Sequence, residues 1–257
     1  MNYFSENLKN IFDFSIRKLT KFSRKNYEEK NEAKENIFNS VEEIERENFL
    51  TEKYSLTEFK NNSTKTNYLE NLYLLDVLDK YLKIEIKDSP NILDIGSKNW
   101  SYAKSEYFFF KQNCAKFLLD GIEIDAHRLY SNLYSRKEVA KFHIKGLENT
   151  NYIEGNFLNH TKKYNCIIWS LPFIKKYPHL KWGLPLEYFR PDEMLRQAYE
   201  SLKPSGQMMI INQGIEEFEI QKQLCKRLNI HIQFAEKIES PFSNYKMDRY
   251  LILVSKE

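Results

Sequence analysis

The stretch NILDIGS, residues 91–97, decides how this chain is interpreted. Its first part, Asn91–Ile95, is a short run of residues that favour β-structure. It ends at a glycine, which predicts a strand followed by a tight loop. Further strand-like runs follow at residues 116–124, 152–154, 165–170, 207–212, 231–238 and 249–254.

Helical runs separate most of these strands, at residues 101–113, from residue 126, from Pro191 and at residues 215–228. Strands that alternate with helices predict right-handed crossovers and a mostly parallel sheet covered on both faces. The last two strands follow each other without a helix, which predicts one antiparallel strand. The predicted fold class is therefore α/β, with a seven-stranded, mostly parallel sheet.

All seven glycines and all seven prolines lie at position 90 or later. Residues 1–89 lack the two residue types that most often break helices, so we expect a helical N-terminal extension. Ser89-Pro90 is the predicted boundary with a second unit, residues 90–257. Within the extension, Asn67 and Glu70 have the spacing of a capping box, and the apolar stretch 68–82 predicts a deeply buried helix.

The first predicted helix is amphipathic. Apolar side chains recur at steps of three and four, and lysine and arginine occupy the other face. We expect the apolar stripe to pack on the chain's own core, with contact to a partner or a membrane surface as the alternative. The stripe consists of Phe4, Leu8, Ile11, Phe12, Ile16, Leu19 and Phe22.

Composition argues against several classes of protein. The 39 basic and 36 acidic residues give a net charge of +3, unlike a protein that coats nucleic acid. The longest uninterrupted apolar run is residues 250–254, so we expect no membrane-spanning helix and no secretory leader. The 3 cysteines and 5 histidines show neither disulfide nor metal-ligand spacing. We therefore expect no metal, and a protein of the reducing cytoplasm.

Ligands of open parallel sheets bind beyond the carboxyl ends of the strands. Polar or acidic groups follow the first four predicted strands at that edge of the sheet. They are Asp94 and Ser97, then Glu123 and Asp125, then Asn156, and then Ser170. This edge therefore predicts a site for a polar, nucleoside-like ligand.

At these positions residues 90–257 resemble a class I S-adenosylmethionine-dependent methyltransferase, a family with a Rossmann-like fold. ILDIGS, residues 92–97, resembles the first motif of the family, and GIEID, residues 121–125, resembles the second. LKPSG, residues 202–206, resembles the family's LKPGG turn into the fifth strand. The resemblance implies S-adenosylmethionine as cofactor and methyl transfer as the reaction.

The resemblance also implies how the cofactor is held. In the family, the acid two residues after the glycine of the second motif binds both ribose hydroxyls, and a carboxylate suits a vicinal diol. That acid is Glu123 here, with Asp125 as the reserve. The implied cofactor contacts are Asp94, Gly96 and Ser97 at the methionine end, Glu123 and Ile124 at the ribose, and Asn156 and Phe157 at the adenine.

The loop after the first strand departs from the family pattern G-x-G-x-G. It reads Gly96-Ser97-Lys98-Asn99-Trp100. Glycines in this loop allow a left-handed backbone and a close approach to the cofactor. We expect Lys98 and Trp100 to crowd that space, and Asn99 to accept left-handed geometry more readily than most residues. A nicotinamide site is not expected, because the chain has no G-x-G-x-x-G.

The fourth strand ends in Ser170-Leu171-Pro172-Phe173, which resembles the (Asn/Asp/Ser)-Pro-Pro-(Tyr/Phe) motif of enzymes that methylate planar amino groups. The first proline of that motif is replaced by Leu171. The resemblance gives Ser170 a catalytic role and places Pro172 and Phe173 at the acceptor. An ordinary strand-end turn is the alternative.

The segment 174–190 is long for a connection between a strand and a helix. Its interleaved basic and aromatic residues are suited to an acidic or planar acceptor, and Tyr177 and Trp182 are the predicted contacts. His179 is the candidate general base because its ordinary pKa lies near neutrality. A solvated loop anchored by a few aromatic side chains is the alternative.

These observations lead to one main hypothesis and two rivals. The first is a methyltransferase that uses S-adenosylmethionine and acts on a small molecule. The second is a methyltransferase-like fold that serves as a non-catalytic binding module, because the cofactor loop lacks glycines. The third is an amino-methyltransferase that acts on nucleic acid, which would show salt-sensitive binding.

Overall fold

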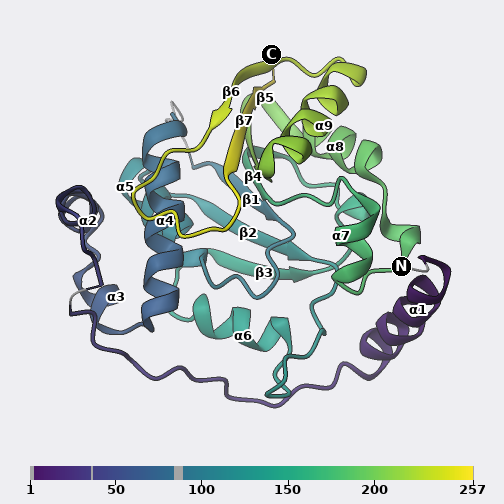
Figure 1. Ribbon diagram of the computed structural model, residues 1–257, viewed down its shortest axis with the longest axis horizontal. Helices are drawn as coiled ribbons and strands as arrows, with labels where there is room; N and C mark the ends of the chain where they lie inside the picture. The colour runs from purple at the N-terminus through teal and green to yellow at the C-terminus, as the bar shows by residue number, and fades with distance from the viewer. Residues whose placement is uncertain (1–2, 36, 84–88, 257) are drawn as a thin grey trace.

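One seven-stranded sheet organises the molecule, with the strand order β3-β2-β1-β4-β5-β7-β6 (Figure 1). The computed structural model describes residues 3–35, 37–83 and 89–256. Strand β7 is antiparallel to both of its neighbours, and the other paired strands are parallel. The strands are β1 Asn91–Ile95, β2 Leu118–Glu123, β3 Thr150–Glu154, β4 Tyr164–Ser170, β5 Leu202–Gln213, β6 Ile232–Lys237 and β7 Arg249–Ser255. The predicted α/β class with one antiparallel strand is confirmed.

Helices cover both faces of this sheet (Figure 1). They are α1 Tyr3–Thr20, α2 Val41–Tyr54, α3 Thr57–Asn61, α4 Lys65–Tyr81, α5 Ala103–Asn113, α6 Arg136–His143, α7 Lys176–Lys181, α8 Pro191–Ser201 and α9 Gly214–Arg227, with short 3-10 turns η1 Phe157–Asn159 and η2 Leu186–Tyr188. The segment 174–190 was expected to be a loop, and it contains α7 and η2. None of the helices in the described ranges has the length and hydropathy needed to cross a bilayer.

The two faces of the sheet belong to two hydrophobic clusters, because successive side chains of a strand point to opposite sides. Ile92 and Ile168 pack with α2, α4 and α5 on one face. Leu93 and Ile167 pack with α8 and α9 on the other. Burial of both faces explains why apolar residues follow one another at 92–93 in β1 and at 166–169 in β4 rather than alternating with polar ones.

Helix α4 is part of the first cluster, and Leu72, Leu75 and Leu78 are almost completely buried. The prediction of a deeply buried helix here is confirmed. The predicted capping box at Asn67 and Glu70 is wrong. Thr64 caps α4 by accepting from the Asn67 N–H, and the Asn67 side chain donates to the Ser101 carbonyl instead.

Helix α1 forms as predicted, but its predicted packing is wrong, because most of the apolar stripe is exposed. The helix packs through Asn10 and Phe14, which are buried. Asn10 donates to the Leu180 carbonyl at 2.8 Å and to the Leu184 carbonyl at 3.2 Å. The inward side of α1 therefore holds the last turn of α7 and the chain just after it.

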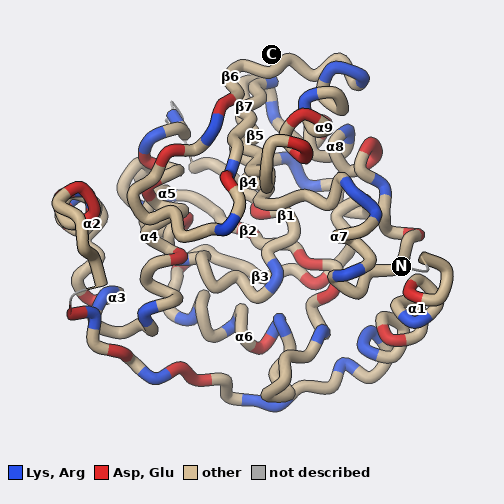
Figure 2. Tube along the Cα trace, viewed as in Figure 1, with Lys and Arg blue, Asp and Glu red and all other residues tan. Residues whose placement is uncertain are grey.

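Between α1 and α2, residues 21–35 and 37–40 run along one side of the molecule without regular helix, and the two helices that they separate lie far apart (Figure 1). Acidic and basic residues are interspersed along this segment and over the rest of the view in Figure 2. This mixing agrees with the near balance of charge in the sequence.

Candidate functional site

A cavity of about 120 Å³ lies at the carboxyl ends of β1, β2, β3 and β4. This is the edge where ligands of open parallel sheets bind. The predicted site residues on its wall are Gly96, Glu123, Ile124, Asn156, Phe157, Ser170, Pro172, Phe173, His179 and Trp182. Asp94, Ser97 and Tyr177 do not line it: the first two are buried and Tyr177 is half exposed.

The loop after β1 keeps a glycine-like backbone although it has lost two glycines. Gly96, Lys98 and Trp100 all have positive φ, at 73°, 55° and 45°. These are the three positions of the G-x-G-x-G pattern. Asn99, which we expected to take this geometry, does not. The loop therefore holds two non-glycine residues, Lys98 and Trp100, in a left-handed conformation that costs an L-residue about 1–2 kcal/mol.

Trp100 does not crowd the cavity, which corrects the expectation from its size. Its side chain is fully buried and its indole Nε1 donates to Glu106 at 2.9 Å. The ring lies against Gly121, where an added Cβ would come within 2.8 Å of it. Because Gly121 has no side chain, the Trp100 ring can pack against it and stay away from the ligand edge of the sheet.

Lys98 does reach the cavity, as expected. Its peptide N–H donates to Glu123 Oε2 at 3.0 Å, and its carbonyl accepts from the Tyr152 hydroxyl at 2.5 Å. Its ammonium lies 4.6 Å from the centre of the Trp182 ring and pairs with no carboxylate among the described residues. Burial lowers the pKa of Lys98, and the nearby Arg136 charge lowers it further.

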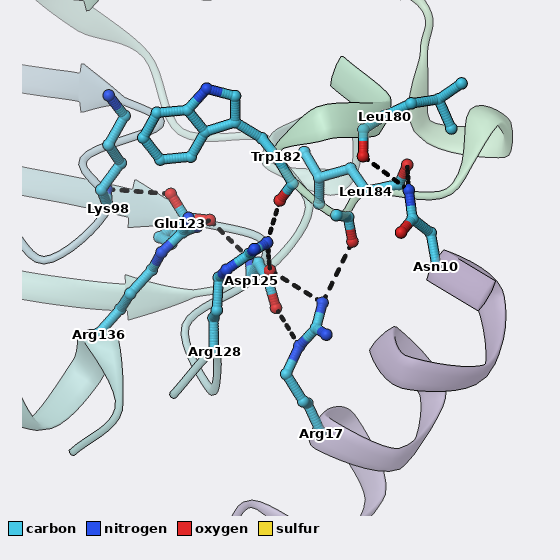
Figure 3. Close-up of polar contacts among 11 residues, drawn as sticks. Asn10, Arg17, Lys98, Glu123, Asp125, Arg128, Arg136, Leu180, Trp182 and Leu184 are labelled. Atoms are coloured by element: carbon cyan, nitrogen blue, oxygen red, sulfur yellow. Dashed lines mark hydrogen bonds and ion pairs between the residues drawn. The ribbon is translucent and has the colours of Figure 1, made fainter. Parts of the chain in front are cut away.

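Glu123 is held by three donors at the end of β2 (Figure 3). Arg136 at the start of α6 donates to Oε1 at 3.0 Å, and both side chains are buried. The Asp125 N–H donates to the same oxygen at 2.7 Å. Oε2 accepts only the Lys98 N–H among the described residues, so it keeps a lone pair for one further donor.

The Asp125 carboxylate is paired with the N-terminal helix and does not line the cavity. Arg17 of α1 donates to both of its carboxylate oxygens at 3.1 Å, and Figure 3 shows this bidentate pair. Arg17 also donates to the Gly183 carbonyl at 3.2 Å. A bidentate pair of this kind fixes orientation as well as charge. It therefore ties α1 to β2 and to the segment after α7.

Asn156 and Phe157 lie at the end of β3, where the adenine contacts were expected. The Asn156 side-chain oxygen caps η1 by accepting from the Leu158 N–H at 3.1 Å. Phe157 is almost completely buried and lines the cavity. A Cβ built on Gly155 would meet no atom within 4 Å, so the wall is open at this point.

The segment after β4 forms an aromatic wall. Leu171 has a φ of 57°, and its N–H donates to the Ile211 carbonyl at 2.8 Å. Backbone strain of this kind in a non-glycine residue clusters at functional sites. Phe173 follows and lies edge-on to His179 at a centroid distance of 5.5 Å.

His179 is buried, and its Nε2 lies 2.8 Å from the Pro185 carbonyl. A carbonyl only accepts, so Nε2 carries the hydrogen and only Nδ1 is left to accept a proton. Burial lowers the pKa of His179, which keeps the ring neutral at physiological pH. The histidine therefore also holds the turn between α7 and η2.

Three arginines complete the site and were missed by the sequence prediction. Arg136 neutralises Glu123, and Arg17 and Arg128 lie 3.1 and 3.6 Å from Asp125. A general signal existed, because two buried acids at one sheet edge require nearby cations. The sequence did not say which of its 39 basic residues would supply them.

No family model and no curated protein matches this sequence. Solved structures do match the fold. A SAM dependent methyltransferase from Aquifex aeolicus is 12% identical with a TM-score of 0.51, covering 79% of this chain and 98% of that chain. The cyclase SpnF is 11% identical with a TM-score of 0.50, covering 72% and 80%. A precorrin-6y methyltransferase from Geobacter metallireducens is 10% identical with a TM-score of 0.45, covering 73% and 88%.

The chain therefore has the class I methyltransferase fold, and the expected resemblance is confirmed at this level. At these identities the matches show the fold and not the reaction.

Proposed function

We propose that this protein is an S-adenosylmethionine-dependent methyltransferase that acts on a small molecule. The observation that carries the proposal is the loop after β1. It holds left-handed geometry at positions 96, 98 and 100 directly beside Glu123. Strained backbone persists only where the surroundings enforce it, and here it reproduces the cradle of a cofactor motif.

The residues present fit the nucleoside end of this cofactor. Glu123 Oε2 has a free lone pair for one ribose hydroxyl. Gly155 leaves open space beside Asn156, whose amide nitrogen donates no hydrogen bond to a described residue, and Phe157 supplies an apolar wall. The cofactor would supply an activated methyl group, and the residues around it would contribute chiefly by orientation.

The residues present also fit the amino-acid end of the cofactor, with one change to the predicted contacts. Asp94 and Ser97 are buried and do not line the cavity, so we assign them the support of the loop rather than direct contact. Lys98 takes their place, since its ammonium faces the cavity and has no carboxylate partner among the described residues. An ammonium in this position is complementary to the carboxylate of the methionine part.

The acceptor would lie against Ser170, Pro172, Phe173 and Trp182. Their aromatic surfaces favour a planar or apolar molecule. The cavity is smaller than the roughly 300–1,000 Å³ of typical ligand pockets, and the Trp182 ring packs on the Lys98 ammonium at its wall. Because the cofactor has to enter the same cavity, we propose that Trp182 moves on binding and that the acceptor is small. His179 positions the wall, and Nδ1 is its only atom available as a base.

Calorimetry with two ligands tests these assignments. S-adenosylhomocysteine carries the amino-acid carboxylate, and 5′-methylthioadenosine lacks it. We expect the wild type to bind both ligands. Lys98→Met should weaken S-adenosylhomocysteine by about tenfold or more, ~1.4 kcal/mol, and leave 5′-methylthioadenosine unchanged. Glu123→Gln should weaken both, and Lys181→Met, at an exposed position of α7, is the matched control.

If the wild type binds neither ligand, the methyltransferase proposal fails. If Lys98→Met weakens both ligands equally, the carboxylate assignment fails and Lys98 serves the loop instead.

A non-catalytic module is the second candidate, and one observation favours it. Arg136 already neutralises the ribose-binding acid from within the chain. The similarity to the cyclase SpnF also shows that this fold is not restricted to proteins named as methyltransferases. Absence of cofactor binding, together with a partner that co-purifies in fixed ratio, would favour this second candidate.

A further inference from the structure

The outward face of α1 is apolar although the helix is anchored to the rest of the molecule. Leu8, Phe12 and Leu19 are 51%, 66% and 85% exposed. With Ile11 and Ile16 they form what we call the outer stripe. At 3.6 residues per turn these five positions span an arc of roughly 140° along one side of the helix. Ser15, which is exposed, is the one polar residue between Leu8 and Leu19 that falls inside this arc, and monomeric proteins rarely leave an apolar surface of this extent in water.

Charge on this exposed face has one sign. Lys9 and Lys18 lie just beyond the two edges of the outer stripe, one on each side. Both are exposed, and neither has an ion-pair partner in the part of the chain that the structure describes. The two acids of α1, Glu6 and Asp13, lie toward the opposite side and are half-buried. The stripe therefore has a basic border.

The anchored side keeps the stripe pointing outward. Asn10 donates to two carbonyls at the end of α7, and Arg17 forms the bidentate pair with Asp125. Phe14 packs on Tyr188 at a ring distance of 5.1 Å. Rotation of α1 to bury the stripe would break all of these contacts, which join parts of the chain far apart in sequence.

We propose that α1 binds the surface of a lipid bilayer that contains anionic headgroups, with the helix axis in the membrane plane. The outer stripe enters the boundary between headgroups and acyl chains, and Lys9 and Lys18 reach up to the phosphates from both edges. This goes beyond the proposed methyl-transfer function and does not depend on it.

A second copy of the chain fits the same surface less well. A two-fold contact through the outer stripe would bring the lysine borders of both copies together, with no exposed acid of α1 to offset them. Lys21 and Lys25 follow α1, but they already pair with Glu154 and Glu138 at 3.0 and 3.8 Å. The charge that an anionic lipid surface complements is therefore that of Lys9 and Lys18.

Vesicle co-sedimentation of the full chain tests the proposal. The probe is phosphatidylcholine vesicles with about one quarter phosphatidylglycerol, compared with pure phosphatidylcholine. We expect the wild type to sediment with the anionic vesicles, less with neutral ones, and less at high salt. Phe12→Glu combined with Leu19→Glu should reduce the bound fraction by about tenfold or more, because charge replaces apolar contact.

The matched control is Val41→Glu, which places the same charge at a 71% exposed apolar position on α2. It should bind as the wild type does, and circular dichroism should show all variants folded. Lys9→Gln with Lys18→Gln should lower binding to anionic vesicles only.

Three results would overturn the proposal. One is a wild type that stays in solution with anionic vesicles. Another is equal sedimentation of the wild type and the Phe12→Glu, Leu19→Glu variant. The third is a dimer in sedimentation velocity that Phe12→Glu dissociates while vesicles bind neither form.

Discussion

Asp94 on β1 and Glu106 on α5 are two acids of the core. Both are fully buried, and neither forms an ion pair with a described residue. Burial raises the pKa of Asp94 to about 8 and raises the pKa of Glu106 well above its usual range. At least one of these two buried carboxyl groups is therefore protonated at neutral pH.

This predicts a specific pH dependence of stability. The unfolded Asp94 loses its proton near pH 4, whereas the folded one keeps it toward pH 8. The native state binds more protons in that window, so stability falls as pH rises through it. We expect Asp94→Asn to flatten this fall and to be more stable than wild type at pH 8 by about 1 kcal/mol or more. Urea unfolding of the wild type and of Asp94→Asn between pH 5 and 8 measures this difference. If the stability of the two proteins falls in parallel with pH, the prediction is contradicted.

In the loop between β1 and α5, the position of a side chain depends on a residue distant in the sequence. The motif predicted the strand, the turn and the ligand edge, because these depend on local pattern and on sheet topology. The expectation that Trp100 would crowd the cavity was wrong, since the position of its ring depends on the missing side chain of Gly121 in the next strand. A local pattern cannot state which pair of residues will pack together across a sheet.

The contact between these two residues predicts a difference between two glycine substitutions. Gly121→Ala places a methyl group 2.8 Å from the Trp100 ring and should destabilise the fold by about 1–3 kcal/mol. Gly155→Ala meets no atom within 4 Å and has an ordinary backbone conformation, so it is the control and should change stability by less than about 0.5 kcal/mol. The denaturant midpoints of the two variants measure this difference. An equal loss of stability in both variants would show that Trp100 can move aside.

At the scale of the whole molecule, the N-terminal half performs two different tasks. Helix α4 shares the core with the sheet, whereas α1 belongs to neither hydrophobic cluster and is held by polar contacts. Periodicity predicted both helices correctly. It could not predict that α1 would present its polar face inward, because that depends on α7 carbonyls and on Asp125, 108 positions from Arg17.

The different tasks predict different effects of truncation. Removal of residues 1–24 should leave a cooperatively unfolding protein with a melting temperature lower by only a few degrees, since no cluster residue is lost. Removal of residues 1–82 should abolish cooperative unfolding, because it deletes one wall of the core. Calorimetry of both forms measures this. An unfolded short truncation would mean that α1 stabilises the core more than its polar contacts suggest.

The position of β7 has a consequence for how the protein is made. This strand lies between β5 and β6, although its residues, 249–255, are synthesised after both. Until they leave the ribosome, β6 has no neighbour in the sheet, and the apolar edge of β5 at Met208–Ile211 lacks its partner. An unpaired apolar edge is a template for wrong pairing. The nascent chain should therefore expose an unpaired apolar strand edge until the residues of β7 have emerged from the ribosome.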